Sequence, residues 1–203
     1  MTRIKLSYFD FPGGRGEDCR LALHLAGVDF EDDRVDPKAW AAKKPSTPFG
    51  SMPVLEIPGE GILAQSNAIL GLLGARYGLL PADDFRAAQH RALLAIVEEL
   101  RMQVEATTSR DDDEAQRKAK REKLAAGYMK SWAQNVERQI KGPFIEGADL
   151  GVVDLKLFVV MNWFKKGVVD HIPATYFDDF PRLTALFAAV SAHPKVVEWY
   201  ARF

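Results

Sequence analysis

The first residues of the chain alternate between polar and apolar side chains from Arg3 to Tyr8, and the pattern ends near Phe9. A period of two is typical of a strand with one buried face. After a turn rich in glycine and proline, residues 15–27 (RGEDCRLALHLAG) place apolar side chains at helical spacing, with a final glycine that can end a helix. Residues 28–35 (VDFEDDRV) then predict a second strand. These elements predict a β-α-β unit with a right-handed crossover between parallel strands.

The next segments complete one small domain. Residues 52–64 (MPVLEIPGEGILA) contain two short apolar runs around a turn at 58–61, which predicts a β-hairpin. Residues 66–78 return to helical spacing. We expect a thioredoxin-like α/β fold, in the order β-α-β-α-β-β-α, for residues 1–81. A proline and a helix-capping aspartate then mark a linker near residues 79–84.

Strand patterns nearly vanish beyond Ala87, and four long segments have helical apolar spacing instead. Residues 82–203 therefore predict an all-helical second domain. The segment 152–166 is so apolar that we expect it to be buried on all sides. The stretch 110–122 carries charges that nearly cancel, which favours a solvated helix or loop over a binding tail. The four helical segments are 87–106, 122–140, 152–166 and 181–200.

Composition narrows the classes of function. The chain has 203 residues, of which 47% are hydrophobic and 27% charged, and its formal net charge is −1. That balance gives no electrostatic footprint for nucleic acid or an anionic membrane. The N-terminal residues lack an apolar signal core and no run of about 18 apolar residues occurs, so we expect a cytoplasmic protein. One cysteine and four scattered histidines offer neither an internal disulfide nor metal-ligand spacing.

Two features of the first domain suit a ligand that carries a carboxylate. Residues 51–54 (SMPV) predict an extended segment that enters a proline turn. Gln65 and Ser66 lie where an extended run gives way to a helical pattern. Because the first backbone N–H groups of a helix have no partner within it, they can face an anion at this point.

The order and spacing of several segments together resemble one family. YFDFPGGRGEDCRLAL at 8–23, then Trp40 and Lys44, then PFGSMPVLE at 48–56 and QSNAI at 65–69 resemble a cytosolic glutathione transferase of the tyrosine type, most like the sigma class. The likeness covers the whole chain and is strongest in the first domain. It implies a homodimer that uses glutathione as co-substrate and conjugates the glutathione thiolate to small hydrophobic electrophiles.

In that resemblance Tyr8 is the catalytic residue. The thiolate is the nucleophile, and a free thiol with a pKa of about 8.5 is mostly protonated at neutral pH. A tyrosine hydroxyl, whose pKa is about 10, keeps its proton and donates a hydrogen bond to the sulfur anion. Arg15 matches a family arginine that tunes the thiolate, although one extra residue separates it from Tyr8. Without the other motifs, a tyrosine at a strand end is more often a packing residue.

The resemblance also assigns residues that bind glutathione. Besides Tyr8 they are Trp40, Lys44, Met52, Pro53, Gln65, Ser66 and Glu99. Pro53 matches a cis-proline that turns Met52, so that the backbone of Met52 pairs with the cysteinyl part of the tripeptide. Gln65 and Ser66 match the pair that binds the γ-glutamyl carboxylate, and Ser66 can also be a plain N-cap. Trp40 and Lys44 match residues that reach the glycyl end of the tripeptide, the first through its indole N–H and the second through its ammonium group.

Further assignments rest on position along the chain. Glu99, with Glu98 as its rival, lies where an acidic residue of the partner subunit approaches the ligand's amino group. Ala106 stands where prostaglandin-isomerising members carry a tryptophan, which weakens a prostaglandin D synthase assignment. Gly151 replaces the usual hydroxyl ahead of Asp154, which predicts a weaker N-cap for the apolar helix. The expected electrophile pocket, between the domains, is lined by Phe9, Phe11, Arg101, Met102, Glu105 and the C-terminal aromatic residues Trp199 and Phe203.

Alternative functions stay open at this point. As a thiol transferase, the chain would form a mixed disulfide between Cys19 and glutathione, but this cysteine falls among apolar positions inside the first helix. A non-catalytic ligand carrier or crystallin-like relative would keep the fold and the glutathione-binding residues with little turnover. A glutathione-dependent isomerase of the prostaglandin synthase type is the third alternative.

Overall fold

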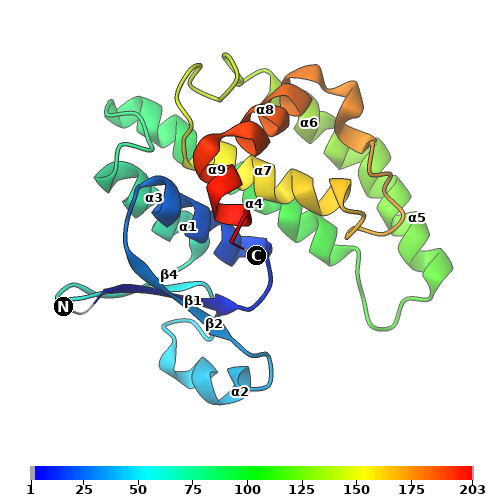
Figure 1. Ribbon diagram of the computed structural model, residues 1–203. Coiled ribbons are helices and arrows are strands. Elements are labelled where there is room, and N and C mark those ends of the chain that lie inside the picture. The colour runs from blue at the N-terminus through cyan, green and yellow to red at the C-terminus, as the bar shows by residue number, and fades with distance from the viewer. Residues whose placement is uncertain (1–2, 203) are drawn as a thin grey trace. The chain divides into compact units, whose positions relative to one another are not determined.

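The computed structural model describes residues 3–202. Their contacts group residues 3–88 with 193–202 in one compact unit, and Gln89–Ala192 in a second. The first unit holds the sheet, and the second is helical (Figure 1). In chain order the elements are β1 (Ile4–Phe9), α1 (Gly14–Leu25), β2 (Phe30–Val35), α2 (Trp40–Lys43), η1 (Lys44–Ser46), β3 (Val54–Ile57), β4 (Gly61–Ala64), α3 (Ser66–Arg76), α4 (Asp84–Ala106), α5 (Glu114–Leu124), η2 (Ala125–Met129), α6 (Lys130–Glu137), α7 (Val152–Lys165), η3 (Tyr176–Asp179), α8 (Pro181–Ala192) and α9 (Pro194–Tyr200).

The sheet of the first unit has the strand order β2-β1-β3-β4. β1 runs parallel to β2 and antiparallel to β3, and β3 and β4 form the expected hairpin. α1 and α3 contact each other, while α2 lies on the other side of the sheet (Figure 1). This arrangement is the thioredoxin-like fold, so the fold predicted from the sequence is confirmed.

The first strand is more enclosed than its alternating pattern predicts. Leu6 and Tyr8 are buried as expected, but Ser7 between them is also only 4% exposed. Its hydroxyl donates a hydrogen bond to Asp33 Oδ2 at 2.5 Å. Lys43 forms an ion pair with the same carboxylate. The polar face of β1 is therefore covered, and its serine is satisfied by a neighbouring strand rather than by solvent.

The helical unit is built around α7. Its residues from Val152 to Met161 are all buried, which confirms the expectation from their apolar composition. The charged stretch forms most of α5, which begins with a capping box in which Asp113 accepts from the Gln116 backbone. Because α5 begins at Glu114, the helical region begins earlier than residue 122, where the long helical pattern starts. A short π-helical turn, η2, joins α5 to α6.

The N-terminus of α7 lacks a capping hydroxyl, as the sequence predicts. Gly151 is the N-cap, and the carboxylate of Asp154 accepts from Gly151 N and Ile145 N, each at 2.8 Å. Asp154 is buried. One carboxylate thus satisfies two backbone donors, one at the N-cap and one in the preceding loop.

The last helix, α9, packs against α1 within the first unit, although it follows the helical segment in sequence. Trp199 is 2% exposed there. The division into domains at 1–81 and 82–203 stays a prediction. In the described part of the chain, no helix is both long and apolar enough to span a membrane. Among the same residues, no cluster of three or more histidine, cysteine or acidic side chains suits a metal ion.

Candidate active site

Tyr8 lies near the end of β1, in register with Arg34 of β2. The first turn of α1 comes very close to its side chain because two glycines leave space for it. A Cβ added at Gly16 would stand 2.1 Å from Tyr8 Cγ, and one at Gly14 would stand 2.6 Å from Tyr8 Oη. The hydroxyl therefore lies beside the N-terminus of α1, where backbone N–H groups favour a negative charge.

The sheet register brings Pro53 and Gln65 to the same end of the sheet as Tyr8. Ser7 of β1 pairs with Val54 of β3, and Val54 pairs with Ala64 of β4. At the next position toward the same end of the sheet, Tyr8 follows Ser7, Pro53 precedes Val54 and Gln65 follows Ala64. Three residues that are far apart in sequence thus form one row, as the predicted glutathione site requires.

The peptide bond between Met52 and Pro53 is cis. This confirms the conformation that the resemblance implies for the proline. Pro53 is buried and Met52 half-buried, directly before β3 begins. The backbone of Met52 is thereby placed beside the Tyr8 end of β1, where an extended peptide can pair with it.

Gln65 has a backbone φ of 75°, a left-handed conformation that is uncommon for a residue with a side chain. It is the N-cap of α3, and Ser66 is the first helical residue, only 4% exposed. Such backbone outliers cluster at functional sites because the surrounding structure has to maintain them. The turn directs the start of α3 to the end of the row formed by Tyr8, Pro53 and Gln65, where the N-terminus of a helix favours an anion.

Aromatic side chains surround Tyr8. The ring centroids of Phe9 and Phe11 each lie 5.6 Å from that of Tyr8. Phe9 also meets Trp40 edge to face at 5.8 Å, and Phe11 is 42% exposed. Two residues predicted for the electrophile pocket are therefore next to the candidate catalytic tyrosine, on its solvent side.

The two lysines at the end of α2 have different surroundings. Lys43 is paired with Asp33, and this hydrogen bond, with that from Ser7, outweighs burial and lowers the pKa of Asp33. Lys44 is exposed, and its Cε would lie 3.2 Å from a Cβ added at Gly50. The exposed ammonium group is thus the one that lies near the segment leading to Met52.

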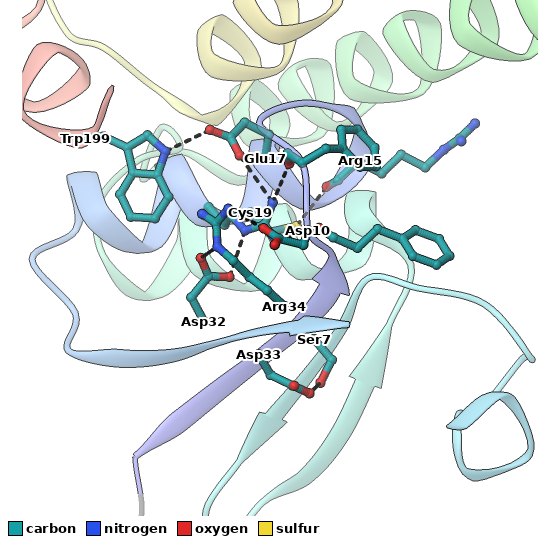
Figure 2. Close-up of polar contacts among 12 residues, drawn as sticks. Ser7, Asp10, Arg15, Glu17, Cys19, Asp32, Asp33, Arg34 and Trp199 are labelled. Atoms are coloured by element: carbon teal, nitrogen blue, oxygen red, sulfur yellow. Dashed lines mark hydrogen bonds and ion pairs between the residues drawn. The ribbon is translucent and has the colours of Figure 1, made fainter. Parts of the chain in front are cut away.

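Arg15 lies in the first turn of α1 and is half-buried. Its carbonyl accepts a hydrogen bond from Cys19 Sγ at 3.5 Å. Figure 2 shows its side chain extending away from Asp32 and Arg34. Cys19 is fully buried, so its thiol cannot form a mixed disulfide while α1 stays folded. The thiol-transferase alternative therefore loses support.

In the helical unit, the structure separates Glu98 from Glu99. Glu98 accepts a hydrogen bond at 2.6 Å from Lys156, which is fully buried. Glu99 is exposed and forms a hydrogen bond with Tyr128. Burial and this bond raise the pKa of Tyr128. Of the two rival glutamates, Glu99 is the one available to another molecule.

The other residues predicted on α4 have mixed positions. Met102 and Glu105 are exposed, whereas Arg101 is fully buried, with its guanidinium 5.3 Å from the Trp163 ring centroid. The helical unit has a cavity of about 470 Å³ between α4 and α6, and Glu99 is the one predicted residue that lines it. The roles of Arg101, Met102 and Glu105 in an electrophile pocket stay predictions.

The C-terminal aromatic residues were expected at the pocket, but Trp199 is enclosed. Its indole N–H donates a hydrogen bond at 2.8 Å to Glu17 Oε1, in a buried contact (Figure 2). A side chain held in this way has no surface left for an electrophile, because its ring packs within the first unit. Phe203 lies outside the described residues.

Three residues near Tyr8 were missed: Gly14, Gly16 and Arg20. Arg20 is fully buried, and its Cζ lies 5.7 Å from the Tyr8 ring centroid. A glycine inside a helical pattern often marks a close approach, and a charged residue among the apolar positions of a helix marks a buried pair. Both signals were present in residues 15–27.

The fold and the site define a thioredoxin-like protein with a helical second unit and a tyrosine at the cis-proline end of its sheet. Residues 4–73 match the family model for the glutathione S-transferase N-terminal domain, and residues 98–202 match that for the C-terminal domain. The chain therefore belongs to the glutathione S-transferase family, whose members use glutathione as co-substrate.

Individual relatives support the same family. Glutathione S-transferase 1 of Ascaris suum is 49% identical over 89 residues, which are 44% of this chain and 42% of the relative. The matches to the first curated relatives thus span about two fifths of their length. Hematopoietic prostaglandin D synthase of Gallus gallus is 29% identical over 98% of this chain and 96% of its own. The structure of prostaglandin synthase D of Nilaparvata lugens has a TM-score of 0.86 at 26% identity, covering 98% of both chains.

Proposed function

We propose that the chain is a sigma-like glutathione transferase that conjugates the thiolate of glutathione to small hydrophobic electrophiles. The observation that carries the proposal is the row of Tyr8, Pro53 and Gln65 across the ends of β1, β3 and β4. It offers a phenolic donor at one end and the N-terminus of α3 at the other. A thiol peptide with a carboxylate matches both ends.

The reaction begins with loss of the thiol proton to solvent. Tyr8 donates a hydrogen bond to the sulfur anion, and the N-terminus of α1 beside its hydroxyl adds a favourable field. Lowering the thiol pKa by about two units requires about 2.7 kcal/mol of preference for the anion, which one charge-assisted hydrogen bond and a nearby cation such as Arg15 can supply. The sulfur lone pair then forms the bond to the electrophile, and the leaving group departs with its bonding electrons.

The remaining residues hold the peptide. Ser66 and Gln65 bind the γ-glutamyl carboxylate at the start of α3, and the backbone of Met52 pairs with the cysteinyl part. Trp40 and Lys44 reach the glycyl end. Phe9 and Phe11 are the first unit's share of the electrophile pocket, since their rings lie beside Tyr8.

Replacing Tyr8 with phenylalanine tests the proposed chemistry. We expect kcat/KM for glutathione with a chlorinated nitrobenzene to fall by about 10- to 1000-fold, with glutathione affinity almost unchanged, because the lost hydrogen bond acts on the anion. Steady-state kinetics and calorimetric binding measure the two effects. Tyr77→Phe is the matched control, since it removes an exposed hydroxyl in the same unit. Equal kinetics for the two variants would refute the role of Tyr8.

Replacing Ser66 with alanine tests the binding role separately. We expect weaker glutathione binding with little change in kcat, because the hydroxyl contacts a carboxylate far from the sulfur. Ser191→Ala, which removes an exposed serine from α8, is the control. A loss of kcat at saturating glutathione, with unchanged affinity, would contradict this division of roles.

A second candidate is a glutathione-dependent isomerase. Two relatives that match nearly the whole chain are described as prostaglandin D synthases. Ala106, at the end of α4, stands where the resemblance expects a tryptophan in such enzymes. Formation of prostaglandin D, measured beside conjugation, separates the two activities. A protein with neither activity that still binds glutathione would support the carrier or crystallin-like alternative.

We also propose that the chain forms a homodimer in the cytoplasm and serves detoxification, as its family membership suggests. The exposed Glu99 is the acidic residue that would approach glutathione in the partner subunit. One similar structure, Na-GST-3 of Necator americanus, is described as monomeric, at 26% identity and a TM-score of 0.80 over 99% of this chain and 97% of its own. Light scattering on the purified protein distinguishes the two states.

A further inference from the structure

The turn that follows Tyr8 is held by one buried side chain, Arg20 of α1. Its Nη2 donates to the carbonyl of Phe9 at 3.0 Å, and its Nη1 donates to the carbonyl of Phe11 at 3.1 Å. Its Nε donates to Asp32 Oδ1 at 2.8 Å. The guanidinium also lies under the Tyr8 ring, at 5.7 Å from its centroid. Arg20 therefore fixes both sides of the turn and the ring itself.

Arg20 is in turn held by Glu17, and Glu17 by the C-terminal helix. Glu17 Oε2 lies 3.3 Å from Arg20 Nη1, and both side chains are essentially unexposed. Glu17 Oε1 accepts from Trp199 Nε1 at 2.8 Å (Figure 2). The Tyr200 hydroxyl forms a further hydrogen bond with Glu17. A buried carboxylate thus joins two donors from α9 to the arginine at the Tyr8 turn.

The ionisation of the Glu17 carboxyl group depends on these donors. Burial raises the pKa of Glu17, while the hydrogen bonds from Trp199, Arg20 and Tyr200 act in the opposite direction. If one donor is removed, the buried carboxylate becomes harder to ionise and holds the guanidinium less firmly. The carbonyls of Phe9 and Phe11 then lose their fixed partner.

Asp32 anchors the other side of the guanidinium. Arg34 donates from Nε to Asp32 Oδ2 at 2.8 Å and from Nη1 to Asp10 Oδ1 at 3.0 Å. Asp10 belongs to the same turn as Phe9 and Phe11. Side chains of β2, as well as Arg20 of α1, therefore hold the turn, and Figure 2 shows the side chains of Asp10, Asp32 and Arg34.

We propose that Arg20 and Glu17 are positioning residues for Tyr8, and that α9 completes their function through Trp199 and Tyr200. The inference rests on the proposed role of Tyr8 in stabilising the thiolate. In this proposal α9 helps to set the position of the Tyr8 hydroxyl, although Tyr8 lies in the first strand. Trp199 and Glu17 are 182 positions apart in sequence.

The test replaces Trp199 with phenylalanine, which keeps an aromatic ring and removes the N–H donor. Trp132→Phe is a closely matched control, because Trp132 is 3% exposed and its Nε1 donates at 2.9 Å to the Ile96 carbonyl in the other unit. Each variant loses one indole hydrogen bond, buried at Trp199 and part-buried at Trp132, and denaturant titration measures the stability that each loss costs. The readout is the pKa of the thiol of bound glutathione, followed by thiolate absorbance, together with kcat and KM.

We expect Trp199→Phe to raise the bound thiol pKa and to lower kcat by about 3- to 10-fold with a small change in KM, while Trp132→Phe leaves all three unchanged. Tyr200→Phe, which removes the second donor, is expected to act in the same direction. Equal behaviour of Trp199→Phe and Trp132→Phe would overturn the proposal, because both would then act on stability alone.

A double-mutant cycle separates this inference from the proposed function. If Tyr8→Phe leaves the bound thiol pKa unchanged, the role of Tyr8 itself fails. If Tyr8→Phe raises the bound thiol pKa, we expect Trp199→Phe to raise it little further in the Tyr8→Phe variant, because the effect of Trp199 passes through Tyr8. Full additivity would overturn the positioning role while leaving the role of Tyr8 intact. The ring resonances of Tyr8 in the ligand-free protein give a readout independent of glutathione, and we expect Trp199→Phe, but not Trp132→Phe, to shift them.

Discussion

Two glycines shape the surroundings of Tyr8 because they have no side chains. Gly14, with a φ of 67°, and Gly16 begin α1 directly against the tyrosine. In most helices a glycine is unfavourable, because it exposes the backbone and lowers helix propensity. Here the missing side chains allow contact between a helix N-terminus and a phenol, and that contact places the hydroxyl where an anion is stabilised.

Replacing Gly16 with alanine tests this close contact. The new Cβ would stand 2.1 Å from Tyr8 Cγ, so the ring has to move. We expect a loss of about 1 to 3 kcal/mol in the free energy of unfolding and a fall of about tenfold or more in kcat/KM. Gly127→Ala is the control, since a Cβ there meets nothing within 4 Å. Denaturant titration and steady-state kinetics give both values, and equal results for the two variants would rule out the contact.

The motif residues of the site could be predicted because each is tied to a local pattern. Pro53 follows an extended run, and Gln65 and Ser66 mark a strand-to-helix change that is visible in sequence. The positive φ of Gln65 and the role of Arg20 were not predictable, since both depend on what the neighbouring elements present to them. A helical pattern indicates which side chains are buried, but it does not indicate which carbonyls they meet.

At the scale of elements, the buried cap of α7 makes stability depend on pH. Burial raises the pKa of Asp154 to about 6, although backbone donors of Ile145, Gly151 and Asp154 itself act against the shift. Between about pH 4 and pH 6 the folded state therefore holds a proton that the unfolded state has released. The free energy of unfolding must fall as pH rises through this window, because the folded state binds more protons there.

Comparing the wild type with Asp154→Asn isolates this effect. We expect the stability of the wild type, relative to the variant, to fall by about 2 kcal/mol from pH 4 to pH 7, because most of the shift of about two pKa units is released in this window. Urea denaturation at several pH values measures the difference. Asp111→Asn, which removes an exposed carboxylate, is the control. The same pH slope for both variants would contradict a buried, proton-binding cap.

Element boundaries show where sequence periodicity is informative and where it is not. The strands, the hairpin and the apolar α7 were predicted because their periods and turn residues are strong. The sequence left a helix or a loop open for residues 110–122, because the cap of α5, Asp113 with Gln116, lies within a run of charges without apolar spacing. The π-helical turn at η2 leaves no simple pattern, since it shifts the helical period by one residue.

At the scale of the whole molecule, the first and the last described helices, α1 and α9, belong to one unit. Val196 and Trp199 of α9 are each 2% exposed, and α9 contacts α1. No local pattern in the sequence predicts this contact, because the chain between the two helices forms a different unit. The sequence alone therefore predicts that residues 193–203 belong to the helical domain.

Ending the chain after Ala192 tests the contribution of α9. We expect amide hydrogens of β1 and α1 to lose protection from exchange, because two large apolar side chains no longer cover α1. Protection in α7, within the other unit, is expected to change much less. A chain shortened only by residues 201–203, after the end of α9, is the control. Uniform loss of protection, or none, would contradict the assignment of α9 to the first unit.

The place of α9 also bears on how the protein is made. A ribosome releases the N-terminal sheet first, whereas the helix that completes the packing of α1 follows the whole second unit in sequence. Domains that are continuous in sequence can finish folding while translation goes on. Here residues 89–192 separate the two parts of the unit that contains Tyr8, so this unit completes its packing only after the second unit has been synthesised.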